Sequence, residues 1–185
     1  NASASSIARA KLNVPRSSRS DPLKTPQEIA DAVKAEFNDA VLAAEPAARV
    51  PSIKVAPAAW PQIALFLRDK MGLNYLVCLT SLDRATELEA VYTLEHLGTA
   101  KDDGARYGIS VRISVPRAAP NIPTVENVWR TADWHEREAW DLMGIVFDGH
   151  HNLSRILCAE DWEGHPLRKD YKAPAYYHGI KNVVV

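Results

Sequence analysis

Residues 107–115 alternate strictly between large apolar side chains and small or polar ones, and no other pattern in the sequence constrains the fold as much. Strict alternation is typical of a β-strand that buries one face and leaves the other in contact with water. Such a strand requires a sheet whose apolar face is covered by a second layer. The side chains expected on the buried face are Tyr107, Ile109, Val111, Ile113 and Val115.

Three segments upstream also have strand character. Residues 75–79 are continuously apolar, which predicts a strand buried on both faces, and residues 88–97 form a longer mixed run. The composition of residues 101–104, Lys-Asp-Asp-Gly, predicts a turn that joins residues 88–97 to residues 107–115 in a hairpin. Residues 52–56 are a short strand candidate. The sheet should therefore contain about four strands.

Two amphipathic helices are predicted before and between these strands. Apolar residues recur at every fourth position over residues 29–41, and Pro26 suits the first turn of that helix. A second helical stripe covers residues 60–71 and should end at Gly72. Helices packed on a small mixed sheet make an α+β, two-layer domain.

The chain of 185 residues is long enough for one domain with a real core and some extended chain. Residues 1–25 contain few large apolar side chains, and four basic residues precede the first acidic one. This composition resembles an organelle transit peptide or a disordered tail, and we favour a flexible basic tail. Residues 26–149 should form the α+β domain, and residues 150–185 an extended segment that docks on a partner.

Regular periodicity is lost beyond Val115. Three prolines within residues 116–123 keep the chain extended, residues 124–130 are a short helix candidate, and another helix should open at Asp133. After Phe147 the sequence has many large polar and aromatic residues and little periodicity. Such a segment cannot build its own core, so we expect it to lie across a surface.

The helix expected near Asp133 has an unusual arrangement of charge. Asp133 should cap it together with Glu136, three residues further on. Arg137 is one turn from both Asp133 and Asp141, which predicts a carboxylate-arginine-carboxylate ladder along one side. Gly144 should end the helix. The apolar residues do not gather into one stripe, as expected of a helix wedged between its own domain and a partner.

Two groups of side chains raise the possibility of chemistry. Glu136 and Glu138 could form an acid-base pair, but residues two apart diverge on a helix, so salt-bridge and capping roles are favoured. His150 and His151, with His165, raise the possibility of a metal site. Adjacent histidines rarely chelate one ion together and no helical pair four residues apart exists, so we expect no metal in this chain.

Cysteine content and charge exclude several other classes of protein. Only Cys78 and Cys158 are present, so we expect no iron-sulfur cluster and no zinc site built on thiolates, and we interpret Cys78 as a small core residue. The formal net charge of -1 gives no reason to expect nucleic acid as a partner. No stretch approaches the ~18 apolar residues of a membrane-spanning helix, so we expect no direct membrane span.

The last third of the chain resembles the signature of the C-subunit family of complex I, the 30-kilodalton-type subunit of respiratory NADH:quinone oxidoreductase. The matching residues are Glu136, Arg137, Glu138, Asp141 to Ile145, Phe147, Gly149, His150, Leu153, Arg155 to Leu157 and Glu160 to Tyr171. Upstream, Asn74 to Leu76, Ile122 to Val125 and Trp129 also fit the family pattern. Met143, His151 and Ser154 depart from it, where the family commonly has an aromatic residue, a proline and a basic residue.

The resemblance implies a scaffold role without catalytic, cofactor-binding or metal-binding residues in this chain. In that family FMN and the iron-sulfur clusters belong to partner subunits, and the whole complex transfers electrons from NADH to quinone with proton translocation. The implied partners are chiefly the D subunit, with the B and I subunits, at the cytoplasmic face of the inner membrane or at the matrix face in mitochondria. The residues expected at the partner interface are Glu136, Arg137, Glu138, Asp141, Gly144, His150, Arg155, Trp162, His165, Arg168, Lys169 and Tyr171.

Three alternatives remain open from the sequence. The chain could be the equivalent subunit of a related membrane complex that uses ferredoxin or serves a hydrogenase, since that subunit would look almost the same. It could be a free-standing enzyme that uses Glu136, Glu138 and His150. A nucleic-acid-binding module is disfavoured by the near-neutral charge and the scattered aromatic residues.

Overall fold

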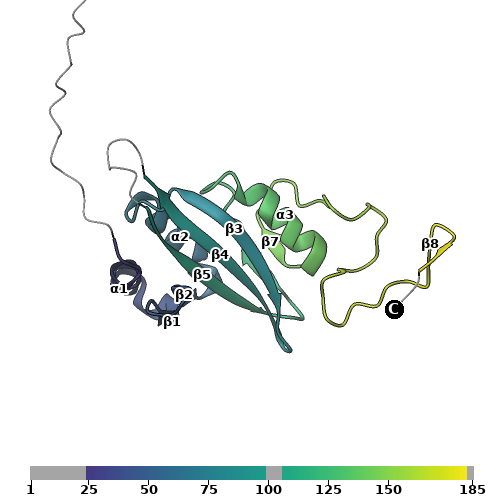
Figure 1. Ribbon diagram of the computed structural model, residues 1–185, viewed down its shortest axis with the longest axis horizontal. Helices are drawn as coiled ribbons and strands as arrows, with labels where there is room; N and C mark the ends of the chain where they lie inside the picture. Colours follow the sequence, from purple (N-terminus) through teal and green to yellow (C-terminus); the bar gives the residue numbers. More distant parts are fainter. Residues whose placement is uncertain (1–23, 99–105, 183–185) are drawn as a thin grey trace, which may run out of the picture.

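The computed structural model describes residues 24–98 and 106–182 (Figure 1). A twisted sheet has five strands in the order β1-β2-β5-β4-β3. The strands are β1 (Val41–Glu45), β2 (Ser52–Val55), β3 (Tyr75–Asp83), β4 (Glu87–Leu97) and β5 (Arg106–Pro116). The first two helices are α1 (Pro26–Phe37) and α2 (Trp60–Asp69), next to the short 3-10 helices Asn38–Ala40 and Pro57–Ala59.

Strand pairing makes the sheet mixed. β5 is antiparallel to β4 along its whole length and parallel to β2 on its other side. The pairs β1-β2 and β3-β4 are antiparallel. The predicted α+β, two-layer fold with a mixed sheet is therefore confirmed, although the sheet has five strands rather than about four. The predicted hairpin of β4 and β5 is also confirmed, while its expected turn at residues 101–104 lies outside the described residues.

The alternating face of β5 lies at the centre of the core. Four of its five predicted side chains are at most 3% exposed, and Tyr107 at the end of the row is half-buried. Figure 1 shows α2 behind the sheet, and the ring of its Trp60 lies 4.6 Å from that of Tyr92 in β4. The ring of Trp129, from the segment after β5, lies 6.2 Å from that of Trp60. Large aromatic side chains thus join the sheet, the helix layer and the later chain in one core.

α1 begins at a capping box. The Thr25 side chain accepts the backbone N–H of Glu28, and the Glu28 carboxylate accepts the backbone N–H of Thr25. Lys24 also contacts the domain, because its Nζ donates to the backbone C=O of Met71 at 3.2 Å. These two residues, which the sequence interpretation placed in the basic tail, belong to the folded part. The rest of that expected tail, residues 1–23, lies outside the described residues.

Val41 does not continue the helical stripe to which its spacing assigned it. α1 ends at Phe37, a 3-10 turn follows, and Val41 opens β1 opposite Val55 of β2. Apolar spacing alone did not reveal this change, because Val41 is apolar in either structure. Its β-branched side chain suits a strand at least as well as a helix.

The prediction that residues 75–79 are buried on both faces is wrong. Leu76 and Leu79 point into the core, whereas Tyr75 and Val77 are 40% and 37% exposed. Cys78 is half-buried and is not the core residue that we expected. The physical reason is that β3 is an edge strand with only one face against the helix layer.

A second small unit follows the sheet. β6 (Asn121–Pro123) pairs in parallel with β7 (Val146–Asp148), and α3 (Ala132–Met143) connects them. α3 packs against the edge strand β3, so it lies beside the sheet and not in the α1 and α2 layer (Figure 1). The predicted helix at residues 124–130 is absent, and these residues form turns instead. The second helix opens at Ala132, one residue before the predicted Asp133.

The chain after β7 is extended and irregular, and Figure 1 shows it leading away from α3 to a small terminal hairpin. That hairpin consists of β8 (Tyr176–Tyr177) and β9 (Ile180–Lys181). Within the described part of the chain, no helix has the length and apolar character needed to cross a membrane.

Two leucines of α2 test the assignment of the core. Leu67 is fully buried, whereas Leu65 on the same helix is 42% exposed. Leu67→Ala should lower the free energy of unfolding by about 2–5 kcal/mol because it opens a cavity. Leu65→Ala should cost less than about 1 kcal/mol. Urea unfolding of both variants measures the difference, and equal costs would contradict the described packing of α2.

Candidate partner-docking site

Asp141 joins the last turn of α3 to the segment that returns after β7. Its side chain is fully buried, and its Oδ2 accepts the backbone N–H groups of Ile156, Leu157 and Cys158 at 3.0, 2.8 and 2.9 Å. Its Oδ1 accepts Nη1 of Arg155 at 2.6 Å. Burial acts to raise the pKa of Asp141, but these donors outweigh burial and hold the pKa well below its ordinary value. A charged carboxylate therefore fixes this stretch onto the helix.

Arg155 extends the same attachment further along the chain. Its Nη2 donates to the backbone C=O groups of Trp162 and Gly164 at 2.8 and 3.0 Å. Its guanidinium carbon lies 5.6 Å from the ring centre of Trp140 on α3. Arg155, which forms a buried ion pair with Asp141, thus also holds the backbone at Trp162 and Gly164.

The carbonyl groups that end α3, those of residues 141–143, are capped from the C-terminal segment. His165 Nδ1 donates to the first at 3.0 Å, the backbone N–H of Leu167 to the second at 3.0 Å, and Arg168 Nε to the third at 2.7 Å. Such groups have no partner within a helix, and a cation at this end also offsets the helix dipole. The segment therefore completes the helix.

Gly144 ends α3 as predicted, and the structure shows why no other residue would fit. Its φ of 71° is left-handed, a conformation that favours glycine. A Cβ at this position would lie 2.4 Å from Cδ2 of His165 and 2.5 Å from Nη2 of Arg168. Both the helix end and the close approach of the capping side chains depend on this glycine.

A second attachment lies at the end of β3. The Asp83 carboxylate accepts hydrogen bonds from both terminal nitrogens of Arg117. It also accepts a hydrogen bond from the backbone N–H of Lys169, at 2.7 Å. Hydrogen bonding to Arg117 lowers the pKa of Asp83 against the opposing effect of burial. Arg117 also pairs with Asp170 at 2.6 Å. The chain is thus held to the edge of the sheet as well as to α3.

Sequence reasoning missed Asp83 and Arg117. Asp83 is 34 residues from Arg117 and 86 residues from Lys169. No local spacing could have indicated these contacts, because only the fold brings the end of β3 next to the returning segment.

The predicted charge ladder around Arg137 is wrong. Arg137 donates to the backbone C=O of Ser154 at 3.3 Å and to its hydroxyl at 2.9 Å, and its guanidinium lies 4.9 Å from the ring centre of Trp134. Asp141 pairs with Arg155 instead. Helical spacing identified neighbours on the helix, but the returning loop supplied closer partners. Ser154, one of the three departures from the resemblance, is the acceptor that Arg137 uses.

The predicted capping box of Asp133 and Glu136 is also wrong. Thr131 is the N-cap residue of α3 and makes no side-chain cap hydrogen bond. Glu136 is fully buried and accepts the Thr124 hydroxyl and, at 2.9 Å, the backbone N–H of Val125. Burial raises the pKa of Glu136 to about 7, although these two donors act to lower it.

The remaining predicted interface residues occupy different environments. Glu138 is exposed on α3, and the side chain of His150 is fully buried beneath the turn after β7. Lys169 is exposed and is held through its backbone alone. Tyr171 is half-buried, and its ring would touch a Cβ at Gly164 at 3.1 Å. The predicted residues therefore build the attachment of the segment more than its outer surface.

The outer surface carries large apolar side chains. Trp134 on α3 is 61% exposed, and Leu157 and Leu167 on the returning segment are 61% and 60% exposed. Tyr176 and Ile180 of the terminal hairpin are 62% and 71% exposed. Large exposed apolar side chains are among those that protein-binding surfaces use.

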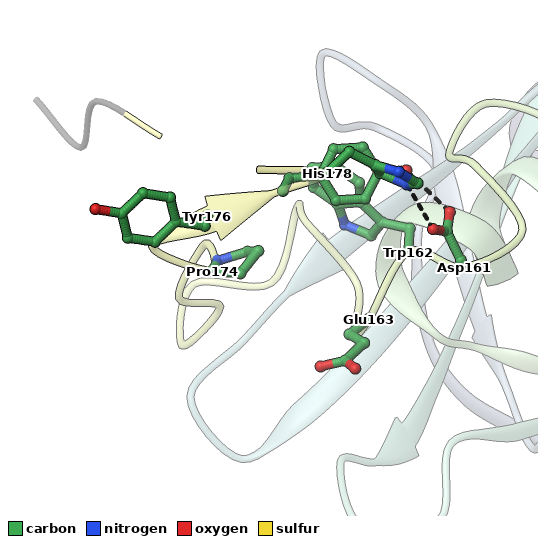
Figure 2. A pocket seen from close by; sticks show the side chains of 7 residues that line it. Asp161, Trp162, Glu163, Pro174, Tyr176 and His178 are labelled. Carbon is green, nitrogen blue, oxygen red and sulfur yellow. Dashed lines mark hydrogen bonds and ion pairs between the residues drawn. The ribbon is translucent and has the colours of Figure 1, made fainter. Parts of the chain in front are cut away.

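Figure 2 shows an aromatic pocket where the terminal hairpin meets the turn at Trp162. The rings of Trp162 and Tyr177 are 5.0 Å apart. Asp161 accepts the Tyr177 hydroxyl at 2.9 Å and contacts Nε2 of His178 at 2.7 Å. These contacts hold the hairpin to residues 161–162, while Tyr176 points outward in the figure.

Replacement of the buried Asp141 tests this attachment. Asp141→Asn removes the charge that faces Arg155 and turns an amide group toward backbone N–H donors, so it should cost about 3 kcal/mol or more. Glu138→Gln, at an exposed position of the same helix, is the control and should be nearly neutral. Urea unfolding at neutral pH measures both. An Asp141→Asn variant as stable as the control would show that this buried network does not hold the segment.

The raised pKa of Glu136 predicts a pH dependence. Its pKa rises from 4.5 to about 7 on folding, so the folded state binds the proton more tightly. Stability from this group is present below pH 4.5 and is lost as the pH rises through about 7, by up to ~3 kcal/mol. Glu136→Gln should flatten this loss in urea unfolding at about pH 5 and about pH 8. Parallel pH profiles for the variant and the unchanged protein would exclude Glu136 as the cause.

Comparisons with known proteins agree with this architecture. The model of the family described as respiratory-chain NADH dehydrogenase, 30 Kd subunit, matches residues 53–177. The C subunit of NADH-quinone oxidoreductase from Chlorobium phaeobacteroides is 47% identical over 156 residues, which cover 82% of this chain and 91% of the relative. The C subunit from Chloroherpeton thalassium is 42% identical over 161 residues, 84% of this chain and 65% of the relative.

Two solved structures share the fold. A trypsin-resistant fragment of Nqo5 aligns over all of its length and 70% of this chain, with a TM-score of 0.57 and 29% identity. A chain of the membrane-bound sulfane sulfur reductase, an archaeal respiratory membrane complex, aligns with 83% of this chain and 89% of its own length, with a TM-score of 0.62. At 22% identity, that likeness concerns the fold alone. The match over both the sheet and the returning segment places this chain in the family of the 30-kilodalton subunit of respiratory-chain NADH dehydrogenase.

Proposed function

We propose that this chain is a structural subunit of the peripheral arm of an NADH:quinone oxidoreductase and has no catalytic residues of its own. The observation that carries the proposal is the segment fastened across α3 by Asp141 and Arg155. Its backbone is occupied by contacts within the chain, while apolar side chains such as Leu157 face outward. A rigid apolar surface of this kind suits permanent assembly, because little ordering remains to be done on binding.

The proposed partners are chiefly the D subunit, with the B and I subunits. α3 and the segment up to Tyr171 would supply the preformed surface, and residues 172–182 would extend from it to reach a neighbouring subunit. The latter stretch has a few contacts with residues 161–162 and no core of its own among the described residues. The complex would hold the chain peripherally at the cytoplasmic face of the inner membrane, or at the matrix face in mitochondria.

Electron carriers are proposed to lie in the partner subunits and not in this chain. Cys78 on β3 and Cys158 on the returning segment are both free thiols on separate elements, and Cys158 uses its backbone N–H to hold Asp141. An iron-sulfur cluster requires several thiolates around one point. FMN and the clusters would therefore belong to neighbouring subunits.

The described geometry supports the free-standing enzyme less well. Glu136 is sealed in the interior by its contacts with Thr124 and Val125, and Glu138 is exposed on the helix surface. His150 is buried as well. The three residues do not line a common cleft, which acid-base chemistry on a substrate would need. The relatives named as NADH-quinone oxidoreductase also favour the quinone reductase over a ferredoxin- or hydrogenase-linked complex.

Purification of the native assembly tests the proposal. A tagged copy of this chain, recovered from the membranes of its source, should bring the D, B and I subunits with it and catalyse NADH-dependent quinone reduction. The isolated chain should contain no flavin and no iron-sulfur cluster and should show no such activity. Recovery of the chain alone, or a flavin bound to the isolated chain, would overturn the proposal.

A pair of leucines separates docking from folding. Leu157 on the proposed surface and Leu42 on β1 are similarly exposed, at 61% and 59%. Leu157→Asp should lower recovery of the partners by about tenfold or more, because it places a charge in an apolar interface. Leu42→Asp should leave recovery unchanged, and both variants should unfold like the parent. Equal recovery with both would show that the surface around Leu157 is not the docking face.

A further inference from the structure

Four side chains of metal-ligand type meet outside the Asp141 attachment. Glu126, Asp133, His150 and His151 each present one ligand atom, and these atoms all lie within 4.8 Å of one another. They come from three places in the chain: the turn after β6, the first turn of α3 and the turn after β7. This ligand cluster brings together the two adjacent histidines and two carboxylates that are distant from them in the sequence.

Two of the distances between ligand atoms match those at a tetrahedral ion. His150 Nε2 lies 3.4 Å from Oε2 of Glu126 and 3.4 Å from Oδ1 of Asp133. Two ligands bound at about 2.1 Å to a tetrahedral zinc ion are about 3.4 Å apart. His151 Nδ1 is closer to Glu126 Oε2, at 2.7 Å, and its ring is 63% exposed, so it can withdraw slightly.

A second observation points into the same cluster. Oδ1 of Asp133 is buried and makes no hydrogen bond of normal geometry with the described residues, although the side chain as a whole is 27% exposed. The side chain of His150, beside it, is fully buried. Buried carboxylate oxygens ordinarily have a partner, because leaving one unpaired is costly. The open side of the cluster is a surface pocket lined by Glu126, Asp133 and His151, so an ion can reach the site from solvent.

We propose that Glu126, Asp133, His150 and His151 form a structural site for a divalent transition-metal ion, with Zn²⁺ as the best fit. Two imidazole nitrogens and two carboxylate oxygens are a ligand set that zinc accepts. The two carboxylates offset the charge of the ion, and Arg130 at the rim of the pocket opposes it in part. The ion would tie the turn after β6, α3 and the start of the docking segment together. This role goes beyond the proposed function, which does not require it.

Binding has a defined local cost. His150 Nδ1 now accepts the backbone N–H of Asn152 at 3.1 Å, so the proton of the ring is on Nε2, which faces the Asp133 backbone C=O at 3.2 Å. A metal on Nε2 requires that proton to move to Nδ1, and the N–H of Asn152, which is exposed, then has to turn toward water.

The sequence alone led to the opposite expectation, because adjacent histidines rarely chelate one ion together and the third histidine considered, His165, forms no helical pair with them. The structure places His165 at the end of α3, where its Nδ1 donates to the backbone C=O of Asp141. Glu126 and Asp133 take its place near the two adjacent histidines. Neither carboxylate has a spacing from the histidines that marks it as a ligand.

Zinc titration of the full-length chain tests the site. Calorimetry with Zn²⁺ alone should give one saturable site per chain, with an affinity that His151→Ala and Glu126→Gln each weaken at least tenfold. His178→Ala is the matched control, since His151 and His178 are both 63% exposed and both lie 2.7 Å from a carboxylate oxygen. The control should keep the affinity of the parent. Co²⁺ in place of Zn²⁺ should give the intense visible absorption of a tetrahedral complex.

Three results would overturn the site. They are the absence of saturable binding, equal affinity in the parent and in both cluster variants, and a loss of affinity in the His178 control as large as in His151→Ala. Thermal unfolding of the metal-free proteins shows whether a variant has lost its fold and not only its metal site. Because His151 is exposed, its replacement should leave the fold intact. If His151→Ala unfolds at the temperature of the parent, its lost affinity belongs to the site. Assembly with partner subunits does not enter this test, so its failure and that of the proposed function are distinguishable.

Discussion

The buried carboxylate of Asp141 is the constraint on which the C-terminal third of this protein depends. A charge that is removed from water is stable only when it is fully paired. Asp141 meets that condition by drawing three consecutive backbone N–H groups and Arg155 onto the last turn of α3. A segment without periodic apolar residues can therefore hold a defined path, because its path is fixed by polar contacts and not by a core of its own.

The segment in turn stabilises the end of the helix to which Asp141 holds it. His165, Leu167 and Arg168 cap the carbonyl groups that end α3, and Gly144 allows them to approach. The Asp83 and Arg117 pair fixes the next turn to the edge strand β3. Backbone groups are thus satisfied within the chain, and Leu157 and Leu167 are left facing outward. Under the proposed function, this surface would be the interface of a subunit that stays assembled.

Strands and helices with one buried face could be predicted from periodicity, because such burial leaves apolar residues at every second or every third to fourth position, as in β5 and α2. The end of α3 at Gly144 could also be predicted, since a left-handed helix end favours glycine. The partners of Arg137 and Glu136 could not be predicted from the sequence. Helical spacing predicted Asp133 and Asp141 as the partners of Arg137, whereas in the folded chain Arg137 donates to Ser154. Val41 was misassigned for a related reason, because an apolar residue fits a helix stripe and an edge strand alike.

Hydrogen exchange on the isolated full-length chain tests the role of Asp141 most directly. We predict strong protection of the amides of Ile156, Leu157 and Cys158, whose N–H groups Asp141 accepts, and fast exchange over most of residues 172–182. Protection at those three amides without any bound partner would show that Asp141 fastens the segment within this chain. Uniformly fast exchange from residue 150 onward would contradict that role, because the segment would then gain its order only from a partner.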